Sequence, residues 1–172
     1  MGFFARLFKK EETPEERETY RKALTQAIGD LIDAEAKFTV ELQKAEKEKN
    51  GTTRVSAENY PIYLSSLSVT DISGCPDEFR DKWRMYLLVI SELAATSARS
   101  LRNWQQMNND NMVRMLPEIS ACGRKISVIR QRQDSLLQEL LLYMERYDIM
   151  QQTMMYSMQK NMPPGIEIVR RK

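Results

Sequence analysis

Cysteine and carboxylate side chains are the groups through which this chain could do chemistry, because its 172 residues include no histidine. Without histidine, the Ser-His-Asp and Cys-His nucleophile systems and the histidine-containing metal sites are excluded. Neither a G-x-G-x-x-G loop nor a Walker A phosphate loop occurs in the sequence. The sequence therefore predicts a protein that is not an enzyme and carries no cofactor and no metal.

Cys75 is the strongest candidate for a reactive group. It precedes Pro76 at the expected start of a helix, where the helix dipole can lower the pKa of a thiol. The alternative is a buried or capping cysteine. If neighbouring helices are antiparallel, Cys75 and Cys122 lie at opposite ends, roughly 60 Å apart at about 1.5 Å per residue. We therefore expect no disulfide, and two free cysteines indicate a reducing, cytoplasmic location.

Methionine is frequent, with 11 residues, and several are spaced four apart near the end of the chain. A flexible thioether stripe can pack in a core or an oligomer interface, hold a partner helix in a groove, or ligate Cu(I). Left in water, each such side chain would forgo roughly 1.5 to 3 kcal/mol of burial free energy. We therefore expect a second copy, a protein partner or other parts of the chain to cover Met150, Met154, Met155, Met158 and Met162.

The first ten residues combine bulky apolar and basic side chains. On a helix the apolar residues share one face and Arg6, Lys9 and Lys10 lie toward the other, as in a segment that lies on a membrane surface. Glu11 and Glu12 follow at once and would repel anionic lipid. A weak peripheral membrane contact, a partner contact and folding back onto the protein are the alternatives for Phe3, Phe4, Leu7 and Phe8.

The overall composition limits the classes of partner. The 26 basic and 24 acidic residues leave a net charge of +2, which is too small to predict nucleic-acid binding. No apolar run approaches the roughly 18 residues that a membrane-spanning helix needs. Six Gly and six Pro are few for a β-rich protein of this length, so the composition favours helix.

Three helices can be placed from capping signals and apolar spacing. A capping box at residues 13–16, which read Thr-Pro-Glu-Glu, predicts a helix over about 14–50. Two more helices are expected at about 76–110 and 117–161, each with apolar residues at steps of three and four. This period is lost over 51–75, where Ser, Thr, Pro and Gly are frequent, so we expect a long, partly ordered loop there.

The apolar stripes of these helices must be buried against one another, so the sequence predicts an all-α, elongated, up-down three-helix bundle similar to a coiled coil. Residues 1–12 form the amphipathic N-terminal segment, 13–162 the bundle domain and 163–172 a C-terminal tail. Glu35 and Gln133 occupy stripe positions, where single polar residues fix the register of packed helices.

These features predict a function in protein interaction. The leading hypothesis is a non-enzymatic interaction or scaffolding module that binds a protein partner or a second copy through its Met-rich end. The alternative is a peripheral membrane adaptor anchored by the amphipathic N-terminus. A third class is an enzyme that uses Cys75 or carboxylates.

Overall fold

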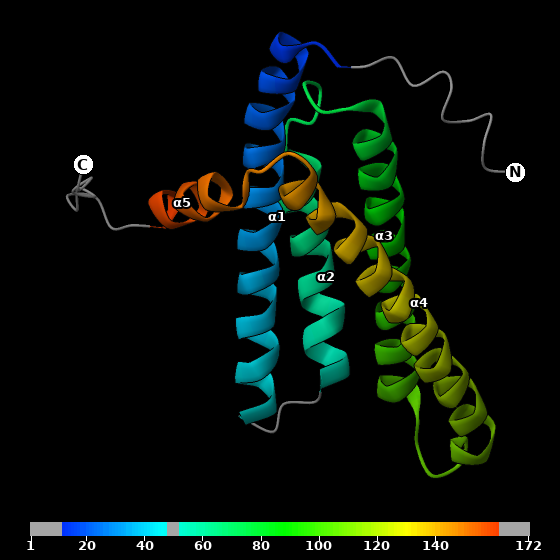
Figure 1. The fold of residues 1–172 in the computed structure, drawn as a ribbon. Helices are drawn as coiled ribbons and strands as arrows, with labels where there is room; N and C mark the ends of the chain where they lie inside the picture. The colour runs from blue at the N-terminus through cyan, green and yellow to red at the C-terminus, as the bar shows by residue number, and fades with distance from the viewer. Residues whose placement is uncertain (1–11, 48–51, 162–172) are drawn as a thin grey trace, which may run out of the picture.

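Five helices make up the part of the chain that this computed structural model describes, residues 12–47 and 52–161 (Figure 1). No strand occurs in those two ranges, so the predicted all-α class is confirmed, whereas the predicted count of three helices is wrong. The helices are α1 (Pro14–Lys47), α2 (Thr52–Ser68), α3 (Asp77–Gln106), α4 (Met112–Arg146) and α5 (Met150–Lys160).

The capping box at the start of α1 forms as predicted. The backbone N–H of Glu16 donates to Thr13 Oγ1 at 3.1 Å, and the backbone N–H of Thr13 donates to Glu16 Oε2 at 2.9 Å. Pro14 is the first helical residue, where a backbone N–H would have no partner within the helix. Local sequence alone is therefore enough to fix where α1 begins.

The segment 51–75 is not a long loop, because α2 occupies most of it. The buried face of α2 consists of residues spaced four, three and four apart, as one side of a helix requires. These residues are Ser56, Tyr60, Tyr63 and Leu67. Pro61 lies inside α2 and removes one backbone hydrogen bond. The two tyrosine rings pack against Phe38 of α1, at centroid distances of 4.6 and 5.3 Å, and this packing compensates for that loss.

The turn between α3 and α4 spans 107–111, so α4 begins at Met112 rather than at Pro117 as predicted. Two asparagines build this turn. The Asn108 N–H donates to Asn111 Oδ1 at 2.8 Å, and the Asn111 N–H donates to Asn108 Oδ1 at 3.1 Å. Pro117 is accommodated in the second turn of α4, where it removes a single backbone hydrogen bond.

The helix predicted over 117–161 is broken at Asp148, which adopts a left-handed conformation with φ of 52°. The Ile149 N–H donates to the Met144 carbonyl at 2.9 Å, and the Asp148 N–H donates to the Glu145 carbonyl at 3.2 Å. These are the two hydrogen bonds of a Schellman motif, which ends a helix. Glycine is commonest at its left-handed position, but the short Asp side chain also tolerates it. The chain turns here, and α5 leaves the line of α4 (Figure 1).

Successive helices from α1 to α4 run in alternating directions (Figure 1). As a consequence α1 and α3 run parallel, which corrects the prediction that the helices at 14–50 and 76–110 are antiparallel neighbours. The extra helix α2 reverses the chain between them. α3 packs against both α2 and α4, and the end of the α3–α4 hairpin extends beyond α2, while α5 lies across α1.

The core lies among the faces that α1, α2, α3 and α4 turn toward one another. The ring centroids of Phe79 and Trp83 are 5.8 Å apart, and Phe79 meets Tyr143 edge-on at 5.1 Å. The largest side chains that are less than 2% exposed are Trp83, Tyr60, Tyr86, Tyr147, Phe79, Leu24, Ile28, Leu31, Leu67, Ile90, Leu93 and Leu140. The apolar residues at steps of three and four in the sequence therefore predicted most of the buried faces of α1, α3 and α4.

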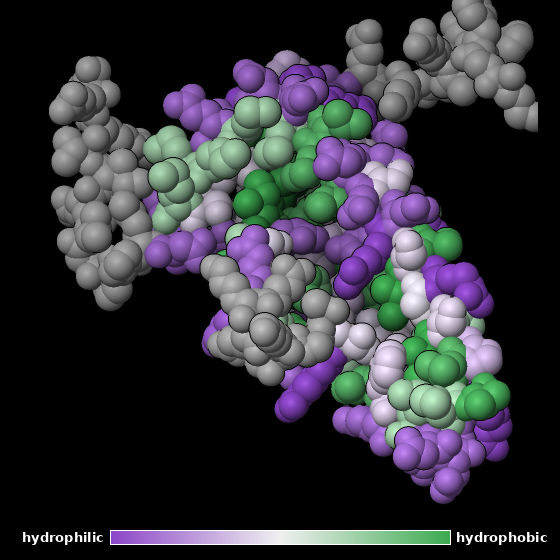
Figure 2. All heavy atoms as spheres, turned by 90° about the horizontal axis from the view of Figure 1, so that it is seen from below, coloured by the Kyte–Doolittle hydropathy of each residue, from purple (hydrophilic) through white to green (hydrophobic). Residues whose placement is uncertain are grey.

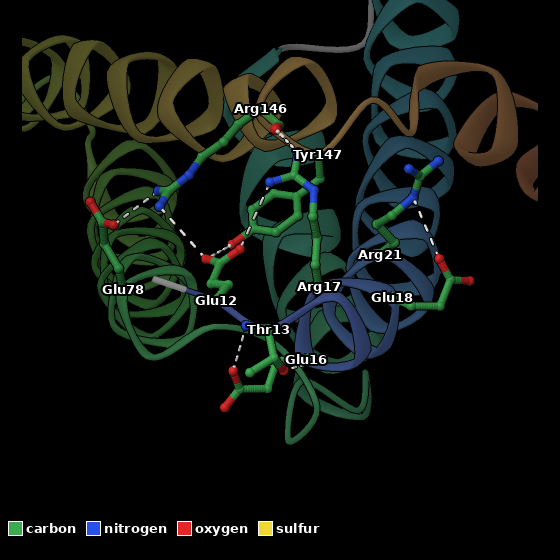
Figure 3. A network of polar contacts seen from close by, with 9 residues as sticks. All are labelled: Glu12, Thr13, Glu16, Arg17, Glu18, Arg21, Glu78, Arg146 and Tyr147. Carbon is green, nitrogen blue, oxygen red and sulfur yellow. Dashed lines mark hydrogen bonds and ion pairs between the residues drawn. The ribbon is translucent and has the colours of Figure 1, made fainter. Parts of the chain in front are cut away.

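A network of hydrogen bonds and ion pairs joins the start of α1 to the end of α4 (Figure 3). The Tyr147 hydroxyl donates to Glu12 Oε1 at 2.6 Å, and burial is the main reason that the pKa of Tyr147 is raised. The guanidinium of Arg146 lies 4.0 Å from Glu12 Oε1 and 3.1 Å from Glu78 Oε2 on α3. Arg17 Nη2 donates to the Arg146 carbonyl at 3.1 Å. The first turn of α1 is thus tied to α3 and α4.

Candidate functional site

α5 carries most of the Met-rich end that the sequence predicted. Met150, Met154 and Met158 are spaced four residues apart and are 49%, 51% and 66% exposed, so they form one solvent-facing side of the helix, named here the methionine surface. Met155 is half-buried, and Met162 lies outside the described residues. Figure 2 shows apolar atoms over α5 on the left of the view. The described part of the chain leaves these three side chains uncovered, and cover by a partner stays a prediction.

The opposite side of α5 is fixed to α1 by a close aromatic contact. The Tyr156 ring lies directly on Gly29, and a Cβ atom at that glycine would collide with ring carbon Cδ1. The Tyr156 hydroxyl donates to Asp30 Oδ1 at 3.2 Å. Thr153 of α5 is fully buried. This packing determines which side of α5 faces solvent.

Two carboxylates of α1 hold the C-terminal end of α5. Lys160 Nζ donates to Asp30 Oδ1 at 2.6 Å, and this hydrogen bond is the main reason that the pKa of Lys160 is raised. Asp33 is only 4% exposed, and its Oδ1 accepts from Asn161 Nδ2 at 2.9 Å and from Ser157 Oγ. Its other oxygen, Oδ2, lies 3.9 Å from Lys160 Nζ. Polar contacts and ring packing together hold α5 in place.

A second apolar surface lies at the end of the α3–α4 hairpin, at the lower right of Figure 2. Four side chains there are between 42% and 85% exposed, namely Trp104, Met112, Val113 and Leu116. Arg102 and Arg114 are exposed on the same helical segments. Sequence reasoning did not identify this surface, although apolar residues directly after the polar turn 107–111 were a signal for it.

The polar residues predicted within the apolar stripes meet at the centre of the bundle. Glu35 Oε1 accepts hydrogen bonds from the hydroxyls of Tyr63 and Tyr86, both at 2.7 Å. Gln133 Nε2 donates to the same oxygen at 3.3 Å. Burial is the main reason that the pKa of each tyrosine is raised, so both hydroxyls stay protonated. α1, α2, α3 and α4 each contribute one residue to this layer, which supports a role in helix register.

Cys75 and Cys122 are both buried and free. Burial raises the pKa of the Cys75 thiol to about 12, with a smaller contribution from the negative charge of Asp71. A nucleophilic cysteine needs the opposite shift, because the thiolate is the reactive form. Of the two alternatives for Cys75, the structure therefore favours a buried structural residue.

The predicted contact residues of the N-terminal segment cannot be placed. The N-terminal residues Phe3, Phe4, Leu7 and Phe8 are outside the described ranges. Within 12–47 and 52–161, no helix has both the length and the apolar character needed to cross a membrane. Over the same ranges, no group of three or more Cys, Asp or Glu side chains is placed to hold a metal ion.

Comparison with known proteins adds no match. No family model matches the chain, no curated protein matches its sequence, and no solved structure matches its fold. The function must therefore be inferred from the surfaces, charges and cavities of the chain itself.

Proposed function

We propose that this chain is a non-enzymatic interaction module that binds a protein partner or a second copy of itself through the methionine surface of α5. The observation that carries the proposal is the exposure of Met150, Met154 and Met158 on one side of a helix whose other side is fixed to α1. A rigidly held helix presents its exposed side in one orientation. That arrangement suits recognition.

The chemistry of the methionine surface supports a helical partner. Side chains four residues apart along a helix form a ridge that can pack into the groove of another helix. Methionine is unbranched and polarizable, so it adapts to partner surfaces of irregular shape. Burying each side chain fully would contribute roughly 1.5 to 3 kcal/mol, about half of which remains to be gained at half exposure.

The titratable groups of the described core support a non-enzymatic role. The raised pKa of Cys75 keeps its thiol protonated near neutral pH. Glu35, Tyr63 and Tyr86 are engaged with one another, as expected of a layer that fixes helix register. These groups are therefore occupied by structural hydrogen bonds or held in an unreactive state.

The test is a double variant, Met154→Glu with Met158→Glu, examined by light scattering and thermal melting. Because both side chains are exposed in the single chain, the melting temperature should change by no more than a few degrees. Self-association should be lost, since four charges would face one another across the interface between two copies. The matched control is Leu88→Glu with Val128→Glu, which adds the same charge at exposed apolar positions of α3 and α4.

Three results would contradict the proposal. A wild-type protein that is monomeric at every concentration rules out the second-copy form. Equal loss of association in the control variant shows that charge, and not the methionine surface, is responsible. A large fall in melting temperature confined to the methionine variant assigns these side chains to the core of the chain.

A second candidate function is contact with a membrane surface, and the end of the α3–α4 hairpin favours it. Exposed Trp104 and Val113 lie close in sequence to the exposed Arg102 and Arg114, a combination found where helices meet the membrane interface. Sedimentation with anionic liposomes can compare three proteins: the full chain, a chain lacking residues 1–10, and a Trp104→Ser, Val113→Ser variant. If the Trp104→Ser, Val113→Ser variant still sediments with the liposomes, the hairpin end is excluded as the membrane contact.

A further inference from the structure

A cavity of about 200 Å³ lies where α2, α3 and α4 meet, away from the methionine surface. Hydroxyl groups line two of its sides, with Thr53 and Ser56 from α2 and Ser97 and Ser100 from α3. Among the described residues that line the cavity, Arg130 of α4 alone is charged. The cavity therefore combines one positive charge with several hydrogen-bonding hydroxyls and no acid.

Gly123 opens this cavity on the side of α4. A Cβ atom at Gly123 would have no described atom within 4 Å beyond its own stretch of helix. A glycine inside a helix makes the helix less stable than an alanine at the same position would. Close approach of a neighbour often explains such a glycine, but no described neighbour uses the space here. Gly123 is itself exposed, so this space opens to solvent at the rim of the cavity that Gly123 lines.

Three of the four hydroxyl groups of the cavity are deeply buried, and that of Thr53 is half-buried. Ser56, Ser97 and Ser100 are 3%, 0% and 4% exposed. Ser97 Oγ has no hydrogen-bond partner among the residues that the structure describes. A buried hydroxyl without a partner destabilises the folded protein, because it has lost its hydrogen bonds to water. A ligand oxygen in the cavity would accept the proton that Ser97 has to donate.

Arg130 is held loosely at the edge of the cavity. Its Nε donates to the Tyr60 hydroxyl and its Nη2 to Ser56 Oγ, both at the long distance of 3.4 Å. It forms no ion pair with any residue in 12–47 or 52–161. A guanidinium has five N–H donors in a planar fork, a geometry that matches phosphate and carboxylate. Its charge is thus available to a ligand.

We propose that this cavity binds a small oxyanion, inorganic phosphate or the phosphate group of a monoester. The guanidinium of Arg130 balances the charge of the anion, and the hydroxyls of Ser97, Ser100 and Thr53 donate hydrogen bonds to its oxygens. Charge-assisted hydrogen bonds of this kind are the stronger ones in proteins. Gly123 keeps the space empty for the anion. This site is separate from the methionine surface, so either proposal can fail alone.

The test uses the two tryptophans of the full-length chain as reporters. The indole N–H signal of Trp104, which lines the cavity, is followed by NMR during a titration with inorganic phosphate at constant ionic strength. The signal of Trp83, which is 1% exposed in the core, is the internal control. Saturable movement of the Trp104 signal alone is the expected result. Absence of a saturable shift, or equal movement of both signals, would overturn the proposal.

Two variants and a matched control assign the effect to the cavity. Arg130→Gln removes the charge and should weaken phosphate binding at least tenfold. Gly123→Leu fills the space and should abolish binding while Arg130 is still present. Arg124→Gln removes an exposed charge from the same helix, hydrogen-bonded to Ser120 outside the cavity, and should leave binding unchanged. Arg130 is exposed, so the Arg130→Gln variant should fold. Equal phosphate affinity in this variant and in the wild type would contradict the site.

A parallel titration distinguishes the two sources of phosphate. Phenyl phosphate carries the same oxyanion with an apolar group, for which Trp104, Ile119 and Ile126 offer contacts. Tighter binding of phenyl phosphate than of inorganic phosphate assigns the site to a monoester, and the reverse assigns it to the free ion. A third titration uses sodium chloride at the same ionic strength. If chloride moves the Trp104 signal with the same affinity as phosphate, the response is general charge screening, and the oxyanion site is overturned.

Discussion

Two glycines inside long helices, Gly29 in α1 and Gly123 in α4, have opposite surroundings. The ring of Tyr156 fills the space above Gly29, whereas nothing described lies within 4 Å of a Cβ at Gly123. In the first region Asp30 and Asp33 accept several hydrogen bonds from α5, although Asp33 Oδ2 and Thr153 Oγ1 have no hydrogen-bond partner among the described residues. Near the second, Ser97 Oγ has no partner. The same residue type thus serves close packing in one place and an open cavity in the other.

This difference shows that a glycine in a helical pattern has no single meaning. A helix loses roughly 1 kcal/mol at each such position, so some other feature must offset the loss. At Gly29 the compensation is visible as the docking of α5. At Gly123, which is exposed, no compensation is visible within the described chain, and the cavity that it lines is where we propose a ligand.

Gly29→Val should have the largest effect in the two regions. The added side chain would collide with the Tyr156 ring, and overpacking as severe as this costs about 3 kcal/mol. Hydrogen exchange should show faster exchange throughout α5 with little change in α3. In the double variant Gly29→Val, Tyr156→Ala the ring is absent and the collision is removed. Part of the lost protection outside α5 should therefore return. Unchanged protection of α5 would show that the close contact does not hold it.

Asp33→Ala should be the next in size. It removes a carboxylate that is 4% exposed and accepts from Asn161 and Ser157, so the free energy of unfolding should fall by about 2 kcal/mol in urea denaturation. The control is Asp81→Ala, an exposed carboxylate that pairs with Arg84 in its own helix, where a change below about 0.5 kcal/mol is expected. Equal effects of the two variants would argue against the polar junction.

Gly123→Ala should stabilise the protein. The Cβ atom meets open space and alanine has the highest helix propensity, so the free energy of unfolding should rise by about 1 kcal/mol. Chemical denaturation in a phosphate-free buffer measures it. Destabilisation by this change would mean that an unseen neighbour already occupies the cavity.

Ser97→Ala should have the smallest effect. The lost hydroxyl is buried and has no described partner, so its removal breaks no described hydrogen bond, and the free energy of unfolding in a phosphate-free buffer should rise by no more than about 1 kcal/mol. Ser100→Ala can be compared with it under the same conditions. A loss of more than about 1 kcal/mol in Ser97→Ala would reveal a hydrogen bond to this hydroxyl in the free protein and would weaken the case for a ligand.

Sequence reasoning succeeded where a helix has an uninterrupted apolar stripe and a clear capping signal. It placed the capping box of α1, the buried faces of α1, α3 and α4, and Glu35 and Gln133 as polar residues within buried stripes, although not their contact with each other. It missed α2 because Ile62 and Val69 suggested an irregular apolar pattern, yet they are 66% and 83% exposed. The buried face of α2 includes the polar residue Ser56, and Pro61 is a residue that usually argues against a helix, so neither indicated a helix here.

The candidate site was only partly accessible to sequence reasoning. The four-residue spacing of methionines predicted the methionine surface. The apolar stripe continues without interruption across Asp148, so the sequence pattern gave no sign that the helix ends there. The buried Asp33 was missed because its partners come from α5, a helix whose direction depends on that break. The cavity around Gly123 depends on three helices from different parts of the chain, and no local pattern encodes such a meeting.

The contact between the start of α1 and the end of α4 has a consequence for folding kinetics. Arg17 and Arg146 are joined across 129 positions in the chain, whereas the other helix pairs of the hairpin series are neighbours in sequence. Closing a loop of that length costs on the order of 4 kcal/mol of chain entropy, and this cost arises before the contacts at its ends can form. Pairs α1–α2, α2–α3 and α3–α4 can form without that cost, so the Arg17–Arg146 contact should form after the folding transition state. Replacing Arg17 should then speed unfolding and leave the folding rate almost unchanged.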